Sequence, residues 1–341
     1  MTNTPDFSVL IVNFNGGKYV QGALDSLKAQ THRSFEVILV DNASADGSVD
    51  ALDTSGLPAF TLMRETENHG FARGNNVAAA AAKGKWLAML NPDAAARPDW
   101  LTRVLAGAQR HPGVTSFACT QIWMHDETKL DGAGDNYLLF GIPWRGGYRR
   151  PFSELPAEGT CFSPCGASAV YNRDTFVQAG GFDERLFCFC EDVDLGFRLR
   201  LEGETCVFLP DAVVAHAGGG LSDKVSGFAV RYGTRNRLWV YLKCMPMPLL
   251  ILTLPGHLAL TVAILLRGLM TGQFGDAVKG LADAVRELEP IWEDRRVVQA
   301  RRVTGMRSLI GAMAWNPLEM LDRKTGVTQA RPPSADRGNR M

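Results

Sequence analysis

Short apolar runs that end in polar residues dominate the N-terminal part of the chain. Three such runs predict buried strands, over residues 7–13 (FSVLIVN), 35–40 (FEVILV) and 86–90 (WLAML). After the first run, Val20, Leu24 and Leu27 recur at helical spacing. This alternation of continuous apolar strands with helices predicts an α/β fold, with a mostly parallel central sheet covered by helices on both faces.

Polar side chains follow each of these strands. Asn13, Asp41 and the segment Asn91–Asp93 stand at the carboxyl ends of the three runs, where open parallel sheets bind their ligands. The Asp41 carboxylate, in VDNASADGS, can accept the imide N–H of uracil or thymine. An Asx-turn or a helix N-cap explains the same residue without a ligand. Both interpretations stay open at this point.

The segment Asn68–Asn76 (NHGFARGNN) precedes an alanine-rich stretch, residues 77–82, that predicts a helix. Its glycines, Gly70 among them, let the backbone approach a ligand closely. Asn75 either lines such a site or caps the helix. The segment is neither a Walker A loop nor G-x-G-x-x-G, which argues against nucleotide sites of those types, including a nicotinamide dehydrogenase.

Two further positions suggest a cation site. Asp93 follows a strand in Asn-Pro-Asp, and one carboxylate with waters and substrate phosphates is the usual arrangement for magnesium. A simple turn explains the same tripeptide. His216, in VVAHAGGG, follows the short strand CVFLP. We expect it in a flexible loop, where it either ligates a cation or a phosphate or is merely structural.

Acidic residues open the helix predicted over residues 191–201. Glu191, Asp192 and Asp194 follow the apolar LFCFC run. Acids at a helix N-terminus are stabilised by the helix dipole, which explains them structurally. Because the preceding apolar segment limits water, the Asp192 carboxylate can instead serve as a general base.

Two segments outside these motifs shape the expected architecture. Residues 145–160 are rich in Gly, Pro and Arg and predict a mobile loop, either a lid or an ordinary surface connection. Residues 244–266 lack Asp, Glu, Lys and Arg and are long enough to cross a bilayer, although Pro246, Pro248 and Pro255 interrupt them. We expect a membrane-embedded or membrane-surface helix, with a buried soluble hairpin as the alternative.

The composition limits the structural class of the protein and the cellular compartment in which we expect it. With 46% hydrophobic and 21% charged residues, the chain is neither disordered nor a disulfide scaffold. Residues 221–341 carry 18 of the 36 basic but only 10 of the 36 acidic side chains, which suits contact with anionic lipid. The seven cysteines lack a paired C-x-x-C, and the N-terminus lacks a signal-peptide pattern. We therefore expect reduced thiols in a cytosolic setting.

Taken in order, these segments resemble family 2 glycosyltransferases of the GT-A fold. The resemblance covers about residues 7–235 and rests on VLIVNFNGG, VDNASADGS, NHGFARGNN, NPDA, CGASAVYNR, GGFDERLFCFCEDVDLGFRLR and HAGGG. The NPDA and CGASAVYNR segments look most like the bacterial rhamnosyltransferase branch, which uses dTDP-L-rhamnose to build cell-surface polysaccharide.

The resemblance implies a role for each candidate residue. Asp192 would be the base that deprotonates an acceptor hydroxyl as it attacks the anomeric carbon and displaces the nucleoside diphosphate in one inverting step. Glu191 would orient the acceptor. Asp93 would bind Mg²⁺ or Mn²⁺ with help from His216, since Asn91 replaces the first acid of the D-X-D motif. The nucleotide-sugar site would be lined by Asn13, Asp41, Asn68, Gly70, Phe71, Asn75, Asn91 and Gly166.

The sequence therefore predicts a GT-A catalytic domain over residues 1–235, a helical membrane-contacting region over 236–330 and a disordered tail over 331–341. We expect rhamnosyl transfer from dTDP-L-rhamnose to a lipid-linked glycan at the cytoplasmic face of the bacterial inner membrane, without a nucleic-acid partner. A UDP-sugar donor, galactose or N-acetylglucosamine, is the alternative for the same mechanism, since Asp41 does not distinguish uracil from thymine. A non-catalytic sugar-nucleotide-binding scaffold is the alternative from another class.

Overall fold

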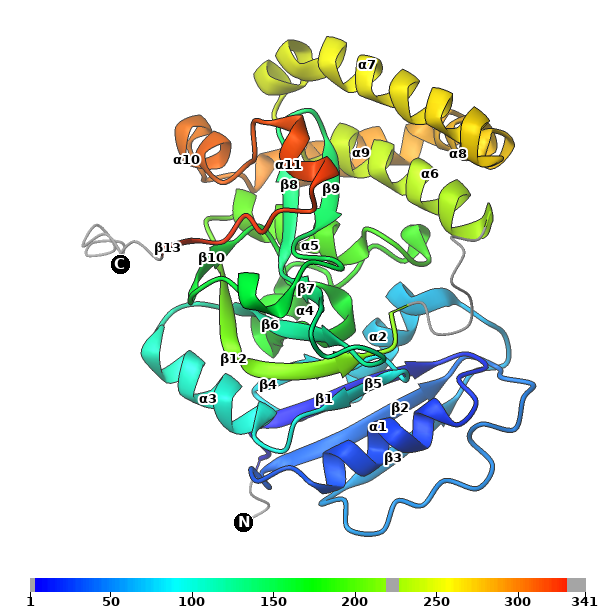
Figure 1. The fold of residues 1–341 in the computed structure, drawn as a ribbon, viewed down its shortest axis with the longest axis vertical. Helices are drawn as coiled ribbons and strands as arrows, with labels where there is room; N and C mark the ends of the chain where they lie inside the picture. Colours follow the sequence, from blue (N-terminus) through cyan, green and yellow to red (C-terminus); the bar gives the residue numbers. More distant parts are fainter. Residues whose placement is uncertain (1–3, 219–226, 330–341) are drawn as a thin grey trace.

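The computed structural model describes residues 4–218 and 227–329. Within them, a mixed α/β unit carries a layer of helices at one end (Figure 1). The strands are β1 (Phe7–Asn13), β2 (Phe35–Asp41), β3 (Phe60–Arg64), β4 (Trp86–Met89), β5 (Ala94–Ala96), β6 (Ser116–Trp123), β7 (Leu130–Ala133), β8 (Asp135–Leu138), β9 (Ile142–Arg145), β10 (Gly159–Cys161), β11 (Val170–Asn172), β12 (Cys206–His216) and β13 (Thr328–Gln329).

The helices of the described residues are α1 (Tyr19–Lys28), α2 (Gly70–Ala81), α3 (Trp100–Arg110), α4 (Arg173–Gln178), α5 (Glu191–Leu201), α6 (Gly227–Cys244), α7 (Met247–Thr271), α8 (Phe274–Arg286), α9 (Leu288–Ala300), α10 (Met306–Gly311) and α11 (Pro317–Leu321). The tail over 331–341, for which the sequence predicts disorder, lies outside the described residues.

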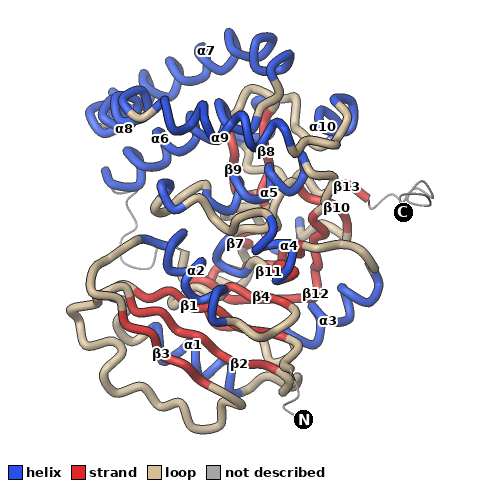
Figure 2. Tube along the Cα trace, turned by 180° about the vertical axis from the view of Figure 1, so that it is seen from behind, coloured by secondary structure: helices blue, strands red, loops and turns tan. Residues whose placement is uncertain are grey.

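The central sheet brings the candidate residues to one edge. Among the described residues its strand order is β13-β10-β12-β6-β11-β4-β1-β2-β3, with β5 beside β12 and β7 beside β6. Figure 2 shows the run of β3, β2, β1 and β4 from behind. The strands β3, β2, β1 and β4 are parallel, as expected. Because β11 is antiparallel to both β4 and β6, the complete sheet is mixed.

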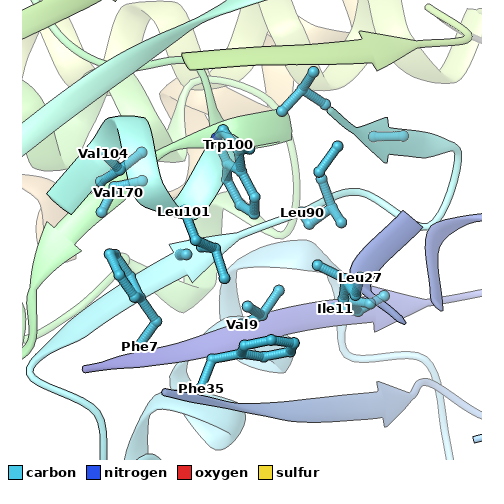
Figure 3. Close-up of a cluster of buried hydrophobic side chains, with 14 of the residues drawn as sticks. Phe7, Val9, Ile11, Leu27, Phe35, Leu90, Trp100, Leu101, Val104 and Val170 are labelled. Atoms are coloured by element: carbon cyan, nitrogen blue, oxygen red, sulfur yellow. The ribbon is translucent and has the colours of Figure 1, made fainter. Parts of the chain in front are cut away.

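Both faces of the sheet are buried, which explains why its strands are continuous apolar runs. On β1, Val9 and Ile11 join the core under α1 and α3, to which Leu27 and Trp100 contribute (Figure 3). Leu10 belongs to the core on the opposite face, under α2, α4 and α5. The two helical layers therefore hold β1 rigidly along its length and fix the position of the polar residues at its end.

The alanine-rich helix begins earlier than expected, at Gly70. The Asn68 Oδ1 atom accepts the Gly70 N–H at 2.9 Å, and the Phe187 carbonyl oxygen accepts the Ala72 N–H at 3.0 Å. These contacts satisfy N–H groups that the first turn of a helix leaves unpaired. Asn75 consequently lies inside α2, so the interpretation of Asn75 as a helix cap is wrong.

Strands occupy parts of two predicted loops. In the segment 145–160, Arg145 ends β9 and Gly159 begins β10, because these residues pair with β8 and β12. The strand β12 extends to His216, whose backbone pairs with Ala94 of β5. His216 is therefore buried at a strand end, and the prediction of a flexible loop there is wrong.

The helical layer shares its core with the sheet unit. Phe197 of α5, Tyr241 of α6 and Leu249 of α7 belong to one buried cluster, and the predicted boundary between residues 235 and 236 falls inside α6. The helix α7 continues through Pro255, so the prolines do not interrupt it. An internal proline costs about 3 kcal/mol. Thr253 and His257, which precede and follow Pro255 in the helix, are buried, and their packing offsets this cost.

Candidate active site

The ends of β1 and β2 form a buried polar edge. Asn13 and Asp41 are register partners, and the Asn13 amide donates to the Asp41 carboxylate at 2.9 Å. The same amide contacts the hydroxyls of Ser44 and Ser48 at 3.0 and 2.9 Å. The Asp41 carboxylate also accepts the Ser44 N–H, at 3.3 Å. The expected turn thus exists, and it orients a carboxylate with lone pairs left for an imide N–H.

The start of α2 lies beside this edge and beside the loop that leads into α5. Gly70 has φ 82°, and a Cβ atom there would lie 2.5 Å from the Phe187 carbonyl oxygen. Only glycine permits both the conformation and the approach. The Asn42 amide donates to the Gly70 carbonyl at 3.0 Å, while Asn75 donates to the Phe71 carbonyl at 2.9 Å. The Asn75 amide therefore stabilises α2 from within.

Asp192 meets the 3₁₀ turn that contains Gly166 (Gly166–Ser168). Its carboxylate accepts the Gly166 N–H at 2.7 Å and its neighbour Val193's N–H at 2.8 Å. A Cβ atom on Gly166 would lie 3.2 Å from the Phe71 ring and 3.4 Å from the Asp192 carboxylate. The predicted residues Phe71, Gly166 and Asp192 are therefore brought together.

The two acids at the start of α5 have raised pKa values. Burial raises the pKa of Asp192, although hydrogen bonds from the Gly166 and Val193 N–H groups oppose the increase. Burial, with the charge of Asp192, raises the pKa of Glu191 well above its usual range. A carboxylate with a raised pKa is a better proton acceptor near neutral pH. This arrangement suits Asp192 to act as a base.

A second group of side chains surrounds His216. The His216 Nε2 atom lies 3.2 Å from an Asp93 carboxylate oxygen and 3.2 Å from the Asn91 amide nitrogen. On the other side of the ring, Nδ1 lies 2.7 Å from the carboxylate of buried Asp131. Burial lowers the pKa of His216, but the hydrogen bonds to Asp131 and Asp93 outweigh it and raise this pKa to about 9. Asp131 was not among the predicted residues.

These side chains fit a divalent cation. Asp131 holds Nδ1 of His216, which leaves Nε2 directed at Asp93, the arrangement in which a carboxylate orients a metal-binding histidine. The Asn91 Oδ1 atom is buried and has no hydrogen-bond partner among residues 4–218 and 227–329. Carboxylate and amide oxygens suit Mg²⁺ and Mn²⁺. The imidazole nitrogen Nε2 completes the set of donors once the cation displaces its proton, which the raised pKa of His216 retains near neutral pH.

Arg145 joins the two groups. Its guanidinium contacts the Asp131 carboxylate at 2.6 Å. Burial lowers its pKa, but the negative charges of Cys165, Asp131, Asp135 and Asp192 outweigh this and raise it above its usual value. Arg145 is therefore a permanent cation between the histidine group and the base.

Asp135 is a further buried acid beside Asp192. The carboxylates of Asp135 and Asp192 and the Cys165 thiol have atoms within 4.8 Å of one another. Burial, with the charge of Asp192, raises the pKa of Asp135 well above its usual range. The sequence analysis missed Asp131, Asp135 and Arg145. The only local signal was a pair of acids in the glycine-rich segment LDGAGDN.

The loop before α5 is held by α6. Phe187, Phe189 and Cys190 have φ 63°, 70° and 67°, a left-handed conformation that is unfavourable for residues other than glycine. The buried Asn236 amide donates to the carbonyl oxygens of Leu186, Cys188 and Phe189 at 2.8, 2.9 and 2.7 Å. Asn236 thereby fixes the strained loop from which the acids of α5 emerge.

Comparison with known proteins agrees with this geometry. The model of glycosyl transferase family 2 matches residues 8–176. The chain is 30% identical over 232 residues to N-acetylglucosaminyl-diphospho-decaprenol L-rhamnosyltransferase of Mycobacterium tuberculosis. This match covers 61% of this chain and 75% of the mycobacterial protein. It is 32% identical to the O-antigen biosynthesis protein RfbC of Myxococcus xanthus, over 59% of this chain and 16% of that protein.

Solved structures share the architecture. The mannosyltransferase PcManGT from Pyrobaculum calidifontis, in complex with GDP-Man and Mn²⁺, superposes with a TM-score of 0.52 at 20% identity, over 94% of this chain and 88% of that one. S. aureus TarS in complex with UDP-GlcNAc gives a TM-score of 0.56 at 16% identity, over 90% of this chain and 89% of that one. At these identities the likeness concerns the fold.

The fold and the site define a glycosyltransferase of the GT-A type. The chain belongs to family 2 of the glycosyltransferases and is similar to its rhamnosyltransferases. The acids of α5, His216 and Asn236 lie beyond the segment that the family model matches. The family match therefore does not cover these residues, and the structure shows where they lie.

Proposed function

We propose that the chain is an inverting rhamnosyltransferase that transfers L-rhamnose from dTDP-L-rhamnose to a lipid-linked glycan at the cytoplasmic face of the bacterial inner membrane. The donor and the acceptor rest on the mycobacterial relative, whose name specifies L-rhamnosyl transfer and an N-acetylglucosaminyl-diphospho-decaprenol substrate. The observation that carries the catalytic part is the contact between Asp192 and the Gly166 turn, close to Phe71 and Arg145.

In this proposal the side chains divide the reaction between them. Asp41 accepts the imide N–H of thymine, and Phe71 and Gly166 border the sugar. Asp192 takes the proton of the acceptor hydroxyl while that oxygen forms a bond to the anomeric carbon. The bond from this carbon to the diphosphate oxygen breaks in the same displacement, which inverts the configuration and releases dTDP.

The leaving diphosphate needs positive charge close to it. Mg²⁺ or Mn²⁺, held by Asp93 and His216 with Asn91 beside them, would supply that charge. Asp131 keeps the His216 ring oriented through its 2.7 Å contact. Arg145 adds a fixed cation on the path from this group to Asp192.

Asp192→Asn tests the catalytic part of the proposal. The amide keeps the shape of the side chain but cannot accept the proton, so donor binding in calorimetry should persist while rhamnosyl transfer falls by a factor of about 100 or more. Asp174→Asn, which changes an exposed acid on α4, is the matched control and should leave transfer unchanged. Unaltered turnover by the Asp192→Asn chain would refute the assignment of the base.

Calorimetric titration with three donors tests the sugar nucleotide. We expect dTDP-L-rhamnose to bind more tightly than UDP-galactose and UDP-N-acetylglucosamine, and Mn²⁺ to strengthen the binding. A preference for a UDP-sugar would keep the mechanism and overturn the donor, since uracil presents the same imide to Asp41. Donor binding without transfer to any acceptor would favour the non-catalytic sugar-nucleotide-binding scaffold.

A further inference from the structure

The helix α7 has its polar residues on the inside and its apolar residues on the outside. Its most apolar window of 18 residues has a mean hydropathy of 2.3, and 28% of that window is buried. After Leu249 and Leu250 in the sequence, the buried residues of α7 are Thr253, His257, Thr261 and Gly268. Apart from Arg267 near the C-terminal end, the exposed large side chains of α7 are apolar: Met247, Ile251, Leu252, Leu254, Leu258, Val262, Leu266, Leu269 and Met270.

The buried polar side chains fasten α7 to the rest of the chain. The Thr253 hydroxyl lies 2.8 Å from the Tyr241 hydroxyl. The His257 ring stacks on Tyr241 at a centroid distance of 4.1 Å, and its Nδ1 atom lies 2.9 Å from the Phe140 carbonyl oxygen. Further along, Thr261 accepts a hydrogen bond from Arg237 at 3.2 Å. The helix is thus attached along its length, and a bilayer-spanning position would draw this polar seam into hydrocarbon.

The exposed face of α7 is an outer boundary of the molecule. Figure 1 shows α7 at the end opposite the strands β1 to β3, and the view from behind in Figure 2 shows the same placement. Leu252 and Met270 are 74% and 89% exposed. A contiguous apolar surface of this kind marks a contact with a partner or a membrane.

A groove beside the N-terminal end of α7 combines apolar walls with cations. Its volume is about 510 Å³, and its lining includes Pro246, Met247, Trp292, Arg296 and Arg302. Both of these arginines are exposed. Apolar walls with guanidinium groups match an amphiphile whose head carries a phosphate.

The neighbouring Arg295, in contrast, has a structural role. It is buried and donates to the carbonyl oxygens of Leu242 and Met245, the latter at 2.6 Å. These bonds fix α9 against the turn that leads from α6 into α7. The groove is therefore a built feature in which Arg296 and Arg302 are the cations available to a ligand.

We propose that α7 docks flat on an anionic phospholipid bilayer, with its outward apolar side chains in the interface and a phospholipid phosphate in the groove between Arg296 and Arg302. Side chains of this kind enter the interfacial region by about 5–10 Å in surface-bound helices. The docking deepens the proposed function, because a lipid-linked acceptor lies in the same surface. It does not depend on the donor or on the base.

Flotation of the full chain with preformed vesicles tests the docking. We expect binding to phosphatidylcholine vesicles that contain phosphatidylglycerol, weaker binding to phosphatidylcholine alone, and release on dilution. Arg296→Gln with Arg302→Gln should weaken binding to the anionic vesicles about 30-fold and binding to the phosphatidylcholine vesicles by a smaller factor. Arg103→Gln, an exposed arginine on α3, is the matched control.

Leu252→Ser and Leu258→Ser test the apolar face. Both leucines are exposed, so the fold should persist, and each change should weaken binding to both kinds of vesicle about tenfold. Leu321→Ser on α11 is the control. Incorporation that resists alkaline extraction would overturn the flat docking in favour of a spanning helix. A dimer that loses vesicle binding, and that Leu252→Ser dissociates, would show that a second copy covers this face.

Donor binding and transfer to a soluble acceptor, measured on the same variants, separate this inference from the proposed function. We expect both to equal those of the parent chain. If the parent chain transfers the sugar but does not bind vesicles, the docking alone is rejected. If it binds vesicles but does not bind the donor, the proposed function alone is rejected.

Discussion

Replacing Asn236 by alanine tests whether α6 sets the geometry of the catalytic base. The change removes the N–H groups that contact the carbonyl oxygens of Leu186, Cys188 and Phe189 at 2.7–2.9 Å. A buried polar group that loses its partner costs about 1–3 kcal/mol. The Leu186 carbonyl oxygen keeps hydrogen bonds from the Cys188 N–H and the Arg235 guanidinium. The carbonyl oxygens of Cys188 and Phe189 lose the Asn236 amide, which costs about 2–6 kcal/mol for the two if the loop keeps its conformation.

The loop can avoid this cost by leaving its strained conformation. Phe187, Phe189 and Cys190 are left-handed, and each such residue costs about 1–2 kcal/mol relative to the right-handed region. Relaxation of all three therefore recovers about 3–6 kcal/mol, which is comparable with the loss. We expect the Asn236→Ala chain to stay folded while its loop no longer positions Asp192.

Steady-state kinetics with calorimetry measures this effect. A shift of about 2.7 kcal/mol against the active loop lowers kcat about 100-fold, while the Kd of the sugar nucleotide, set at the edge around Asp41, should stay unchanged. Arg231 lies on α6, as Asn236 does, and forms an ion pair with Asp283 of α8. Arg231→Ala removes this pair and should leave kcat unaltered. Reduced thermal stability with an unchanged kcat would refute the positioning role of Asn236.

A second substitution sharpens the test. Glycine adopts the left-handed conformation without strain, so Phe189→Gly in the Asn236→Ala chain should stabilise the active loop by about 1 kcal/mol and restore kcat about fivefold. A purely structural role of Asn236 gives no reason for this rescue.

Other substitutions test the charges around the site. Asp131→Asn should weaken Mn²⁺ binding in calorimetry about 10–100-fold, because it releases the His216 ring; unchanged affinity would contradict this role. Lys243→Met should lower the free energy of unfolding in urea by about 3–5 kcal/mol, because Asp183 and Asp194 lose their buried cation; a change within experimental error would count against the buried pairs. Burial raises the pKa of Asp183, but the charge of Lys243 outweighs burial and lowers this pKa below its usual value. The contribution of Asp183 to the free energy of unfolding, measured in urea, should therefore be fully present above about pH 4 and decline as the pH falls further.

The parallel half of the sheet could be predicted because its strands are buried on both faces. Continuous apolar runs marked β1, β2 and β4, and the polar residue after each run marked its end. Parallel strands place such residues at one edge, which is why Asn13 and Asp41 contact each other and why Asp93 lies at the same side of the sheet. The role assigned to each of these residues stays a prediction.

Antiparallel pairing and helix packing brought in the residues that the sequence did not reveal. Asp131 and Asp135 reach the site on β7 and β8, whose partners depend on register that the local pattern does not specify. Arg145 belongs to a segment whose glycines and proline predict a loop. Asn236 lies in a helix far along the chain, and its amide is distinguished only by the three carbonyl groups it meets in the fold.

The hydrogen bonds from the Asn236 amide to the loop before α5 also set the order in which parts of the site form during synthesis. The contact between Asn13 and Asp41 needs the strands β1 and β2, which leave the ribosome early, and domains begin to fold from the N-terminus as they emerge. The left-handed loop, in contrast, has no Asn236 to hold it until more than forty further residues have followed. A nascent chain can therefore form the contact between Asn13 and Asp41 well before α6 is available to hold the loop that precedes Asp192.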